Sequence, residues 1–229
     1  MLNINKLKIS SAHKQLVDIS FDIKDSIALI GESGSGKSLT LKALLNLLPS
    51  TLKLDKDINS TFELNYDTIG FIPQNPFTSL SMMTKIKDQF FCPIEKKEEV
   101  LKLVDLDISL LNKFPSQLSG GQIQRIVIAI ALSRNIKLLL LDEPTTALDE
   151  ENKTNIINLI NDLKNRLNIL ILFVTHDIES IKDICNEIII LKDGQIIEKG
   201  FTRDILSSPK EDYTKKLINS TFKNKNFRN

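Results

Sequence analysis

Several features that often reveal function are missing from this chain of 229 residues. It has no tryptophan and only two cysteines, Cys92 and Cys185, whose separation is typical of reduced thiols in a cytosolic protein and not of a metal site. The 30 Lys and Arg residues balance the 29 Asp and Glu residues, so charge gives no reason to expect a nucleic-acid partner. The longest apolar runs, residues 169–174 and 188–191, fall far short of the ~20 residues that span a bilayer. The first ten residues lack the apolar core of a secretory signal. We therefore expect a cytoplasmic protein that meets a membrane only through a partner.

Four short apolar runs predict buried parallel strands. They are Ile27–Ile30, Leu138–Leu141, Ile169–Val174 and Ile188–Leu191. Helical patterns near Glu150–Leu167 and Ile178–Asn186 separate the later runs, which favours an α/β core with right-handed crossovers. A turn signal at 192–195 predicts a hairpin that leads into Ile196–Glu198. Weak alternation over residues 7–23 indicates an antiparallel edge.

The middle of the chain, residues 79–132, has no strand-like run and is interrupted by Pro93 and Pro115. We interpret it as an α-helical subdomain inserted into one domain that covers residues 1–229. The polar, basic end of the chain, about 220–229, is predicted to be frayed.

The strongest single motif is GESGSGKS, residues 31–38, which fits the phosphate-binding loop G-x-x-x-x-G-K-[ST]. A predicted strand precedes it and an apolar helix, residues 39–48, follows until Pro49, and these flanks argue against a chance Gly/Ser turn. Lys37 is expected to reach the β/γ-phosphates of a nucleotide, and the Ser38 hydroxyl is expected to bind Mg²⁺. The predicted nucleotide-binding residues are Gly31, Glu32, Ser33, Gly34, Ser35, Gly36, Lys37, Ser38 and Leu39.

Two carboxylates, Asp142 and Glu143, end the predicted strand 138–141. Ligands bind at the carboxyl ends of strands in open α/β sheets, so Asp142 is a candidate for holding Mg²⁺ and Glu143 for polarising an attacking water. A second Gly-rich turn, Ser119-Gly120-Gly121-Gln122, opens another apolar helix over 123–132 and is a second candidate anion site. One loop already suffices for one nucleotide, so the second turn is expected to serve a nucleotide held by another subunit. The alternative is a serine N-cap with no ligand.

Three further motifs complete a set. They are FIPQNP with Gln74, Thr146-Ala147-Leu148-Asp149, and Val174-Thr175-His176-Asp177. In this order and composition, with LSGGQ and LLLLDEP, the motifs resemble those of the ATP-binding subunits of ABC transporters over about residues 1–200. The resemblance implies a RecA-like P-loop NTPase core with a mainly parallel sheet, an inserted α-helical subdomain and an antiparallel β subdomain.

The resemblance also implies roles for individual residues. Glu143 would be the catalytic base, His176 would sense the γ-phosphate, and Gln74 would contact Mg²⁺ and the attacking water and couple the site to a membrane partner. Ser119, Gly120, Gly121 and Gln122, with Asp149, would act on the ATP of the opposite subunit in a head-to-tail dimer. The implied cofactors are ATP and Mg²⁺. The implied partners are membrane-spanning permease subunits, a second ABC ATPase subunit and, indirectly, a substrate-binding protein.

A finer resemblance concerns the cargo. Gln74 to Ser81 and Ser208 to Leu217 are similar to segments of dipeptide, oligopeptide and nickel importers, which implies uptake at the cytoplasmic face of the cytoplasmic membrane. The alternatives are an exporter, or an ABC-type ATPase that acts on DNA or the ribosome. Two departures stand out. Only 24 residues separate Pro49 from Gln74, so the antiparallel subdomain should be reduced, and Ser10 to His13 supply no aromatic ring to stack on adenine.

Overall fold

The computed structural model describes residues 1–146 and 148–223, and within it the chain forms two compact units. One unit contains Met1–Leu64 and the chain from Leu170 onward, and the other is Asn65–Ile169. The predicted helical insertion, 79–132, falls inside the second unit. The two units are described separately below.

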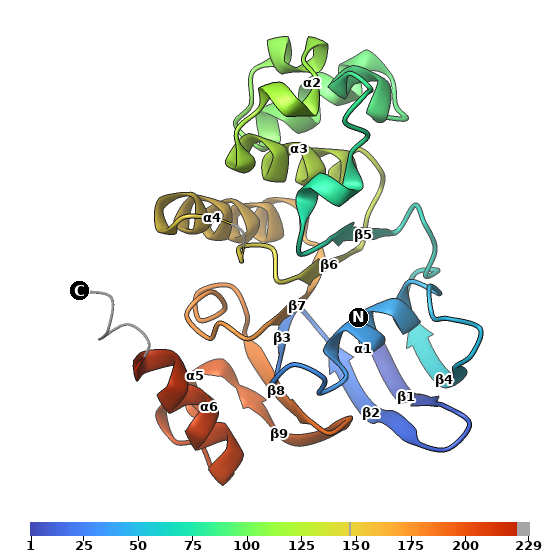
Figure 1. Cartoon of the computed structure of the whole chain (residues 1–229), viewed down its shortest axis with the longest axis vertical. Helices are drawn as coiled ribbons and strands as arrows, with labels where there is room; N and C mark the ends of the chain where they lie inside the picture. Colours follow the sequence, from blue (N-terminus) through green and yellow to red (C-terminus); the bar gives the residue numbers. More distant parts are fainter. Residues whose placement is uncertain (147, 224–229) are drawn as a thin grey trace. The chain divides into compact units, whose positions relative to one another are not determined.

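The first unit begins with a three-stranded antiparallel sheet. Its strands are β1 (Leu2–Ser10), β2 (Gln15–Ile23) and β4 (Lys53–Ser60), in the order β2-β1-β4 (Figure 1). Inward residues of β1 such as Leu2, Ile4 and Leu7 are fully buried, so the alternation produces one apolar face as expected. The sequence did not reveal β4, because its run of alternating Lys and Asp side chains is largely exposed and has no apolar period.

Three parallel strands lie beside one another in the same unit. The strand β3 (Ser26–Ile30) pairs with β7 (Leu170–Thr175) on one side and with β8 (Glu187–Lys192) on the other. The antiparallel strand β9 (Gln195–Phe201) follows β8 through the predicted hairpin. All five β3 residues are buried, as expected for a strand covered on both faces. The helices of this unit are α1 (Lys37–Leu44), α5 (Thr202–Ser207) and α6 (Asp212–Lys223).

The described part of the second unit, 65–146 and 148–169, contains two parallel strands and three α-helices. The strand β5 (Ile69–Ile72) pairs with β6 (Leu138–Asp142). The helices are α2 (Ile94–Leu103), α3 (Gly120–Leu132) and α4 (Glu150–Leu167). Short 3₁₀ turns lie between β5 and α3, at Pro76–Ser79, Ile86–Gln89, Ile108–Asn112 and Pro115–Gln117. The fold is therefore α/β, as predicted, with a three-stranded antiparallel sheet and a helical segment.

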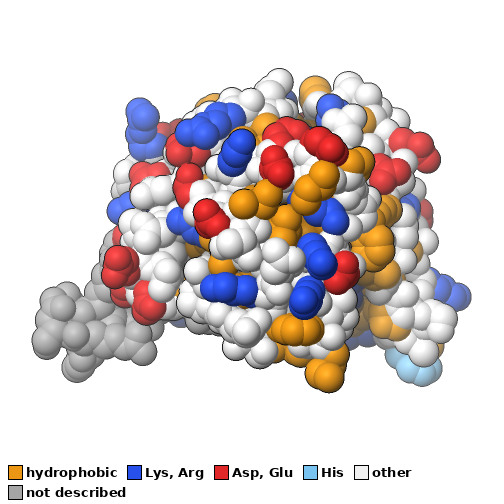
Figure 2. All heavy atoms as spheres, turned by 90° about the horizontal axis from the view of Figure 1, so that it is seen from above, with side chains coloured by type: hydrophobic (Ala, Val, Ile, Leu, Met, Phe, Trp, Pro, Cys, Tyr) orange, Lys and Arg blue, Asp and Glu red, His pale blue; other side chains and the backbone are white. Residues whose placement is uncertain are grey.

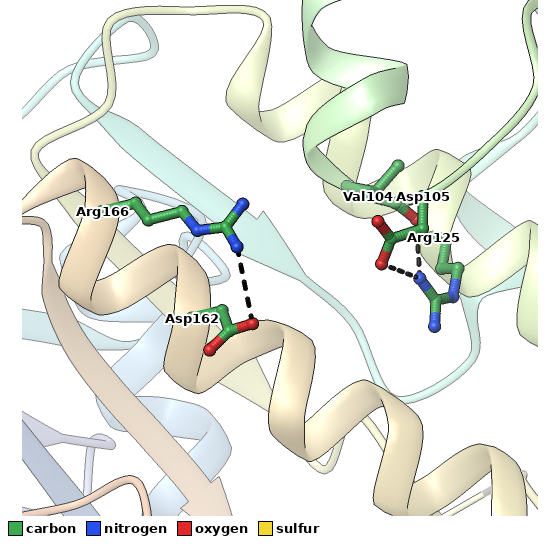
Figure 3. Close-up of polar contacts among 5 residues, drawn as sticks. All are labelled: Val104, Asp105, Arg125, Asp162 and Arg166. Atoms are coloured by element: carbon green, nitrogen blue, oxygen red, sulfur yellow. Dashed lines mark hydrogen bonds and ion pairs between the residues drawn. The ribbon is translucent and has the colours of Figure 1, made fainter.

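One arginine ties two of these helices together. Arg125 of α3 donates to the backbone oxygen of Val104, at 2.7 Å, and to the Asp105 carboxylate at 3.2 Å (Figure 3). Val104 is the residue at which α2 ends, so the guanidinium satisfies a carbonyl that the helix leaves without an internal partner. A second pair in the same view, Asp162 and Arg166 of α4, is exposed and 3.9 Å apart, and it contributes little.

Two sequence predictions about helices are corrected. The segment 178–186 forms turns and not a helix, because the Asp177 carboxylate accepts from the Glu179 N–H and the Ser180 hydroxyl and so offers a local alternative to helical bonding. The first helix runs from Lys37 to Leu44 and not over 39–48. It ends early because Asn46 adopts a left-handed conformation, with φ 56°, and closes the helix in a Schellman motif.

The C-terminal helix overlaps the segment that is predicted to be frayed. α6 includes residues 220–223, which were predicted to be part of a frayed end. The remainder of that predicted segment, 224–229, lies outside the described residues.

Candidate nucleotide-binding site

The phosphate-binding loop joins β3 to α1 in the first unit. Gly34 and Gly36 have φ values of 83° and 110°, which L side chains rarely adopt, and Gly36 is the N-cap of α1. A Cβ at Gly31 would lie 2.2 Å from the backbone oxygen of Leu191. The loop therefore needs glycine at all three positions, and the helix that begins at Lys37 presents its N-terminal end to whatever the loop encloses.

The loop lysine is bonded to its own loop. The Lys37 side chain is 7% exposed, and its Nζ donates to the backbone oxygens of Gly31 at 2.7 Å and Glu32 at 2.9 Å. The hydroxyl oxygen of Ser35 is buried and has no hydrogen-bond partner among the described residues. Ser38 is exposed at the second position of α1. A buried ammonium, an unsatisfied hydroxyl and helix N–H groups fit a bound phosphate.

The β8–β9 hairpin supports this loop from outside. The Gly194 N–H donates to the Ser35 backbone oxygen at 3.0 Å, and the Gly194 oxygen accepts from the Asp18 N–H at 2.8 Å. A Cβ at Gly194 would lie 2.0 Å from the Leu16 oxygen, so the turn requires glycine. The sequence predicted the hairpin but not its contact with the loop, because the contact joins backbone groups far apart in the chain.

The predicted histidine follows a strand that neighbours the loop's strand. Ile30 of β3 is paired with Thr175 of β7, so Gly31 and His176 both come one residue after paired positions at the carboxyl edge of the sheet. His176 is exposed, and the turn after it is fixed because the Asp177 N–H donates to the Thr175 hydroxyl at 2.9 Å. Strand pairing thus brings His176 to the start of the phosphate-binding loop.

In the second unit, the structure brings Gln74 and Glu143 together. These residues follow the neighbouring strands β5 and β6, whose Ile72 and Leu141 are paired. The Gln74 amide donates to Glu143 Oε2 at 3.1 Å, and the Thr146 hydroxyl donates to the same oxygen at 3.2 Å. Sequence reasoning missed this contact of Thr146.

Glu143 itself is held in an uncommon backbone conformation. Its φ of 47° is left-handed, which is rare for a residue other than Gly, Asn or Asp. Such strain is concentrated at functional sites, where the surrounding structure maintains it. The neighbouring Asp142 ends β6 and is half-buried.

The Ser-Gly-Gly-Gln turn caps α3 in the same unit. The Ser119 hydroxyl oxygen accepts from the Gln122 N–H at 3.3 Å, and the Gln122 side-chain oxygen accepts from the Ser119 N–H at 3.0 Å. This reciprocal capping box uses a lone pair of the serine oxygen, so its O–H remains available as a donor. The capping alternative and the predicted anion site are therefore compatible. A Cβ at Gly121 would lie 2.7 Å from the side-chain oxygen of Asn152, and Gly121 is buried.

Asp149 caps the next helix, α4. Its carboxylate accepts from the backbone N–H of Asn152 at 2.9 Å and from the Asn152 side-chain amide at 2.8 Å. These hydrogen bonds, that from the backbone N–H first, hold the pKa of Asp149 below its ordinary value. Asp149 is therefore an anion at neutral pH. Ala147 of the same predicted motif lies outside the described residues.

Within the described ranges, no group of three or more His, Cys, Asp or Glu side chains is arranged to hold a metal ion. Of the predicted Mg²⁺ ligands, Ser38 belongs to the first unit, and Gln74 and Asp142 belong to the second. Phosphate oxygens or water usually supply further ligands of this ion. The loop between β1 and β2, where the sequence supplies no aromatic ring to stack on adenine, is closed by hydrogen bonds between Ser11 and Lys14, and His13 is exposed.

The loop, the strand before it and the helix that starts at its lysine define an α/β protein of the P-loop nucleotide-binding class. The family model described as ABC transporter matches residues 16–146. The chain therefore belongs to the ABC transporter family, and it is an ATP-binding, ATP-hydrolysing subunit.

Individual relatives support this assignment. The oligopeptide transport ATP-binding protein AppD of Bacillus subtilis is 34% identical, with 96% of this chain and 78% of that protein covered. A methionine import ATP-binding protein, MetN of Lactobacillus acidophilus, is 35% identical over 88% of this chain and 63% of its own length. A dimeric ATP-binding cassette solved in a post-hydrolysis state with ADP and Pi has a TM-score of 0.71 and 26% identity, and covers 89% of this chain and 99% of that chain. Among the described helices, none has the length and apolar character needed to cross a bilayer.

Proposed function

We propose that this chain drives an importer for short peptides or chelated nickel, at the cytoplasmic face of the cytoplasmic membrane, by hydrolysing ATP in a dimer of ABC subunits. The observation that carries the catalytic part is the Glu143 carboxylate, which Gln74 and Thr146 both contact. The similarity to AppD, an oligopeptide transport protein, supports the importer.

In the proposed reaction, Glu143 accepts a proton from the water that attacks the γ-phosphate. The hydrogen bonds from Gln74 and Thr146, both to Oε2, orient the carboxylate for this proton transfer. Lys37 turns from its loop carbonyls to the phosphates, whose developing charge it stabilises, and His176 donates to the γ-phosphate from the edge of the neighbouring strand. Mg²⁺, held by Ser38, Gln74 and Asp142, would neutralise phosphate charge.

The second anion site acts on the partner's nucleotide in this proposal. Each chain offers the N-terminal end of α1 behind its own loop and the N-terminal end of α3 with the Ser119 hydroxyl. Two chains in a head-to-tail dimer can therefore enclose two ATP molecules, each between one loop and the other chain's Ser119–Gln122 turn. Asp149 belongs to the same interface. ATP favours the closed dimer because it contacts both chains there, and hydrolysis removes that preference.

Exposed apolar side chains that follow Gln74 in the sequence fit the proposed permease partner. Met83 and Phe91 are each 89% exposed, and Ile94 at the start of α2 is 48% exposed. Figure 2 shows hydrophobic side chains among Lys, Arg, Asp and Glu on one face of the molecule. Exposed apolar side chains that lie close in sequence to a residue at the active carboxylate support contact with another subunit.

The cargo is tested by uptake. The gene is deleted, and uptake of labelled dipeptides, oligopeptides, methionine and nickel is measured, with the deletion complemented by the unchanged chain or by Lys37→Ala. Peptide or nickel uptake should fall, and only the unchanged chain should restore it. A defect in methionine uptake alone would reassign the cargo. Unchanged uptake of all these compounds, with a defect in exporting some compound, would overturn the importer proposal.

A further inference from the structure

The C-terminal helix α6 touches the phosphate-binding loop through one side chain. The hydroxyl oxygen of Tyr213, in the first turn of α6, accepts a hydrogen bond from the backbone N–H of Glu32 at 3.1 Å. Glu32 is the second residue of the loop, so residues 181 positions apart in the sequence are joined at the nucleotide site.

The same tyrosine also contacts the hairpin that supports the loop. The Lys192 ammonium, at the end of β8, lies 5.1 Å from the centre of the Tyr213 ring, within the range of a cation–π contact. The Gly194 N–H, in the turn that follows Lys192, donates to Ser35. One side chain of α6 thus reaches both the loop and its external support.

The start of α6 is itself anchored to the sheet. The Glu198 carboxylate of β9 is buried and accepts from the backbone N–H groups of Lys210 at 2.9 Å and Glu211 at 3.2 Å. These are the residues immediately before α6, so the position of Tyr213 is determined by β9 and not by a loose terminus.

We propose that Tyr213 is a positioning residue for the phosphate-binding loop: its hydroxyl holds the Glu32 peptide in the orientation that the nucleotide-bound loop requires. This inference rests on the proposed nucleotide site at residues 31–39. In the structure, the Glu32 carbonyl is held by Lys37 at 2.9 Å and by the Ser35 N–H at 3.2 Å, while Tyr213 holds the Glu32 N–H.

The contribution of Tyr213 differs between the empty and the occupied loop. When Lys37 moves to the phosphates, the Glu32 carbonyl loses its hydrogen bond to the ammonium. Fewer hydrogen bonds then hold the Glu32 peptide in place, so the one to Tyr213 contributes more to its orientation. An interaction that matters more in the bound state raises affinity for the nucleotide. Burial raises the pKa of Tyr213, so the hydroxyl is neutral across the working range of pH.

The test replaces only the hydroxyl. Tyr213→Phe keeps the ring and its contact with Lys192, and it should weaken binding of a non-hydrolysable ATP analogue about two- to tenfold, the range of one hydrogen bond. The KM for ATP should rise in parallel, with kcat at saturating ATP unchanged within about twofold. The matched control is Tyr66→Phe, because Tyr66 is the other of two tyrosines, is 68% exposed and lies in the other unit.

A second variant tests whether Tyr213 acts through its hydrogen bond with the Glu32 N–H. Glu32→Pro removes the N–H that Tyr213 accepts, so Tyr213→Phe should have no further effect on affinity in that background. An equal loss of affinity with and without Glu32→Pro, or an unchanged Kd for Tyr213→Phe alone, would overturn the inference.

Amide hydrogen exchange of the unsubstituted full chain tests the same bond without any folding risk. Although residue Glu32 is exposed, its N–H should exchange more slowly than the N–H of Ser33. Exchange of the Glu32 N–H at the rate of an unprotected amide would also overturn the inference. If the unsubstituted chain binds no nucleotide, the proposed site is wrong. If it binds nucleotide and Tyr213→Phe is silent, only the role of Tyr213 is wrong.

Discussion

The amide nitrogen of Gln74 lies 3.1 Å from Oε2 of Glu143, within hydrogen-bonding distance. The two residues follow adjacent parallel strands and are 69 positions apart in the sequence. A carboxylate that is held by a neighbouring amide is oriented before any substrate arrives. A displacement of the Gln74 segment by a partner would therefore change the orientation of Glu143.

Glu143→Gln should retain ATP binding but reduce turnover by about 10²–10⁴-fold, because an amide cannot accept the proton from water. Gln74 and Thr146 can still donate to the amide oxygen, so the local structure should persist. Steady-state phosphate release and ATP binding are measured together, and a closed dimer with trapped ATP should accumulate. Near-normal hydrolysis would remove Glu143 from the role of base.

Ser119→Arg should abolish hydrolysis while nucleotide still binds the monomer. The added side chain would occupy the place of the partner's phosphate and leave the chain's own loop intact. Ser119→Thr is the matched control, since it keeps a hydroxyl for both the helix cap and the phosphate. Dimer formation is followed by light scattering in the presence of ATP. If monomeric binding is lost together with activity, the turn does not act across an interface.

Selectivity for the base should be poor, since the β1–β2 loop around His13 offers no Tyr, Phe or Trp ring to stack on adenine. The phosphate contacts are the same for both nucleotides. GTP should therefore compete with ATP within about tenfold, a difference of about 1.4 kcal/mol. Competition against a fluorescent ATP analogue measures this, and a preference above about a hundredfold would reveal a base contact elsewhere.

Acid should weaken the attachment of α6 through Glu198. Burial acts to raise the pKa of Glu198, but the hydrogen bonds, led by that from the Lys210 N–H, outweigh it and hold the pKa below its ordinary value. A depressed pKa gives stability that is present above the unfolded-state pKa and is lost as pH falls through the lower folded-state pKa.

Glu198→Gln should therefore reduce the free energy of unfolding by about 1–3 kcal/mol at pH 7, and the difference from the unchanged chain should disappear in acid. Urea unfolding between pH 3 and 7 measures it. Glu211→Gln makes the same charge change at an exposed side chain and should have little effect. A constant difference at every pH would exclude a contribution from ionised Glu198.

Sequence reasoning succeeded where local patterns determine the outcome. Apolar runs identified β3, β6, β7 and β8 because each is short and buried, and the GESGSGKS motif identified the loop because its glycines are needed for left-handed backbone. The range of α4 was also predicted correctly, since the capping residues at its ends and the spacing of its apolar residues indicate the same helix.

The failures share a physical cause. The charged strand β4 is stabilised by pairing with β1, which no local period reveals. The turns after His176 replaced a predicted helix because Asp177 side-chain bonds compete with helical ones. The contacts of Thr146 with Glu143 and of Tyr213 with Glu32 depend on three-dimensional proximity, so the sequence segments that contain Thr146 and Tyr213 did not reveal them.

The bonds between Lys37 and its own loop have a consequence for how nucleotide affinity is interpreted. In the absence of ATP, the ammonium is already solvated by the Gly31 and Glu32 carbonyls, so binding exchanges one set of oxygen partners for another. A measured Kd then reports the difference between the two sets and not the strength of the phosphate contacts alone. A substitution that disturbs the empty loop can therefore tighten binding without adding any contact to ATP.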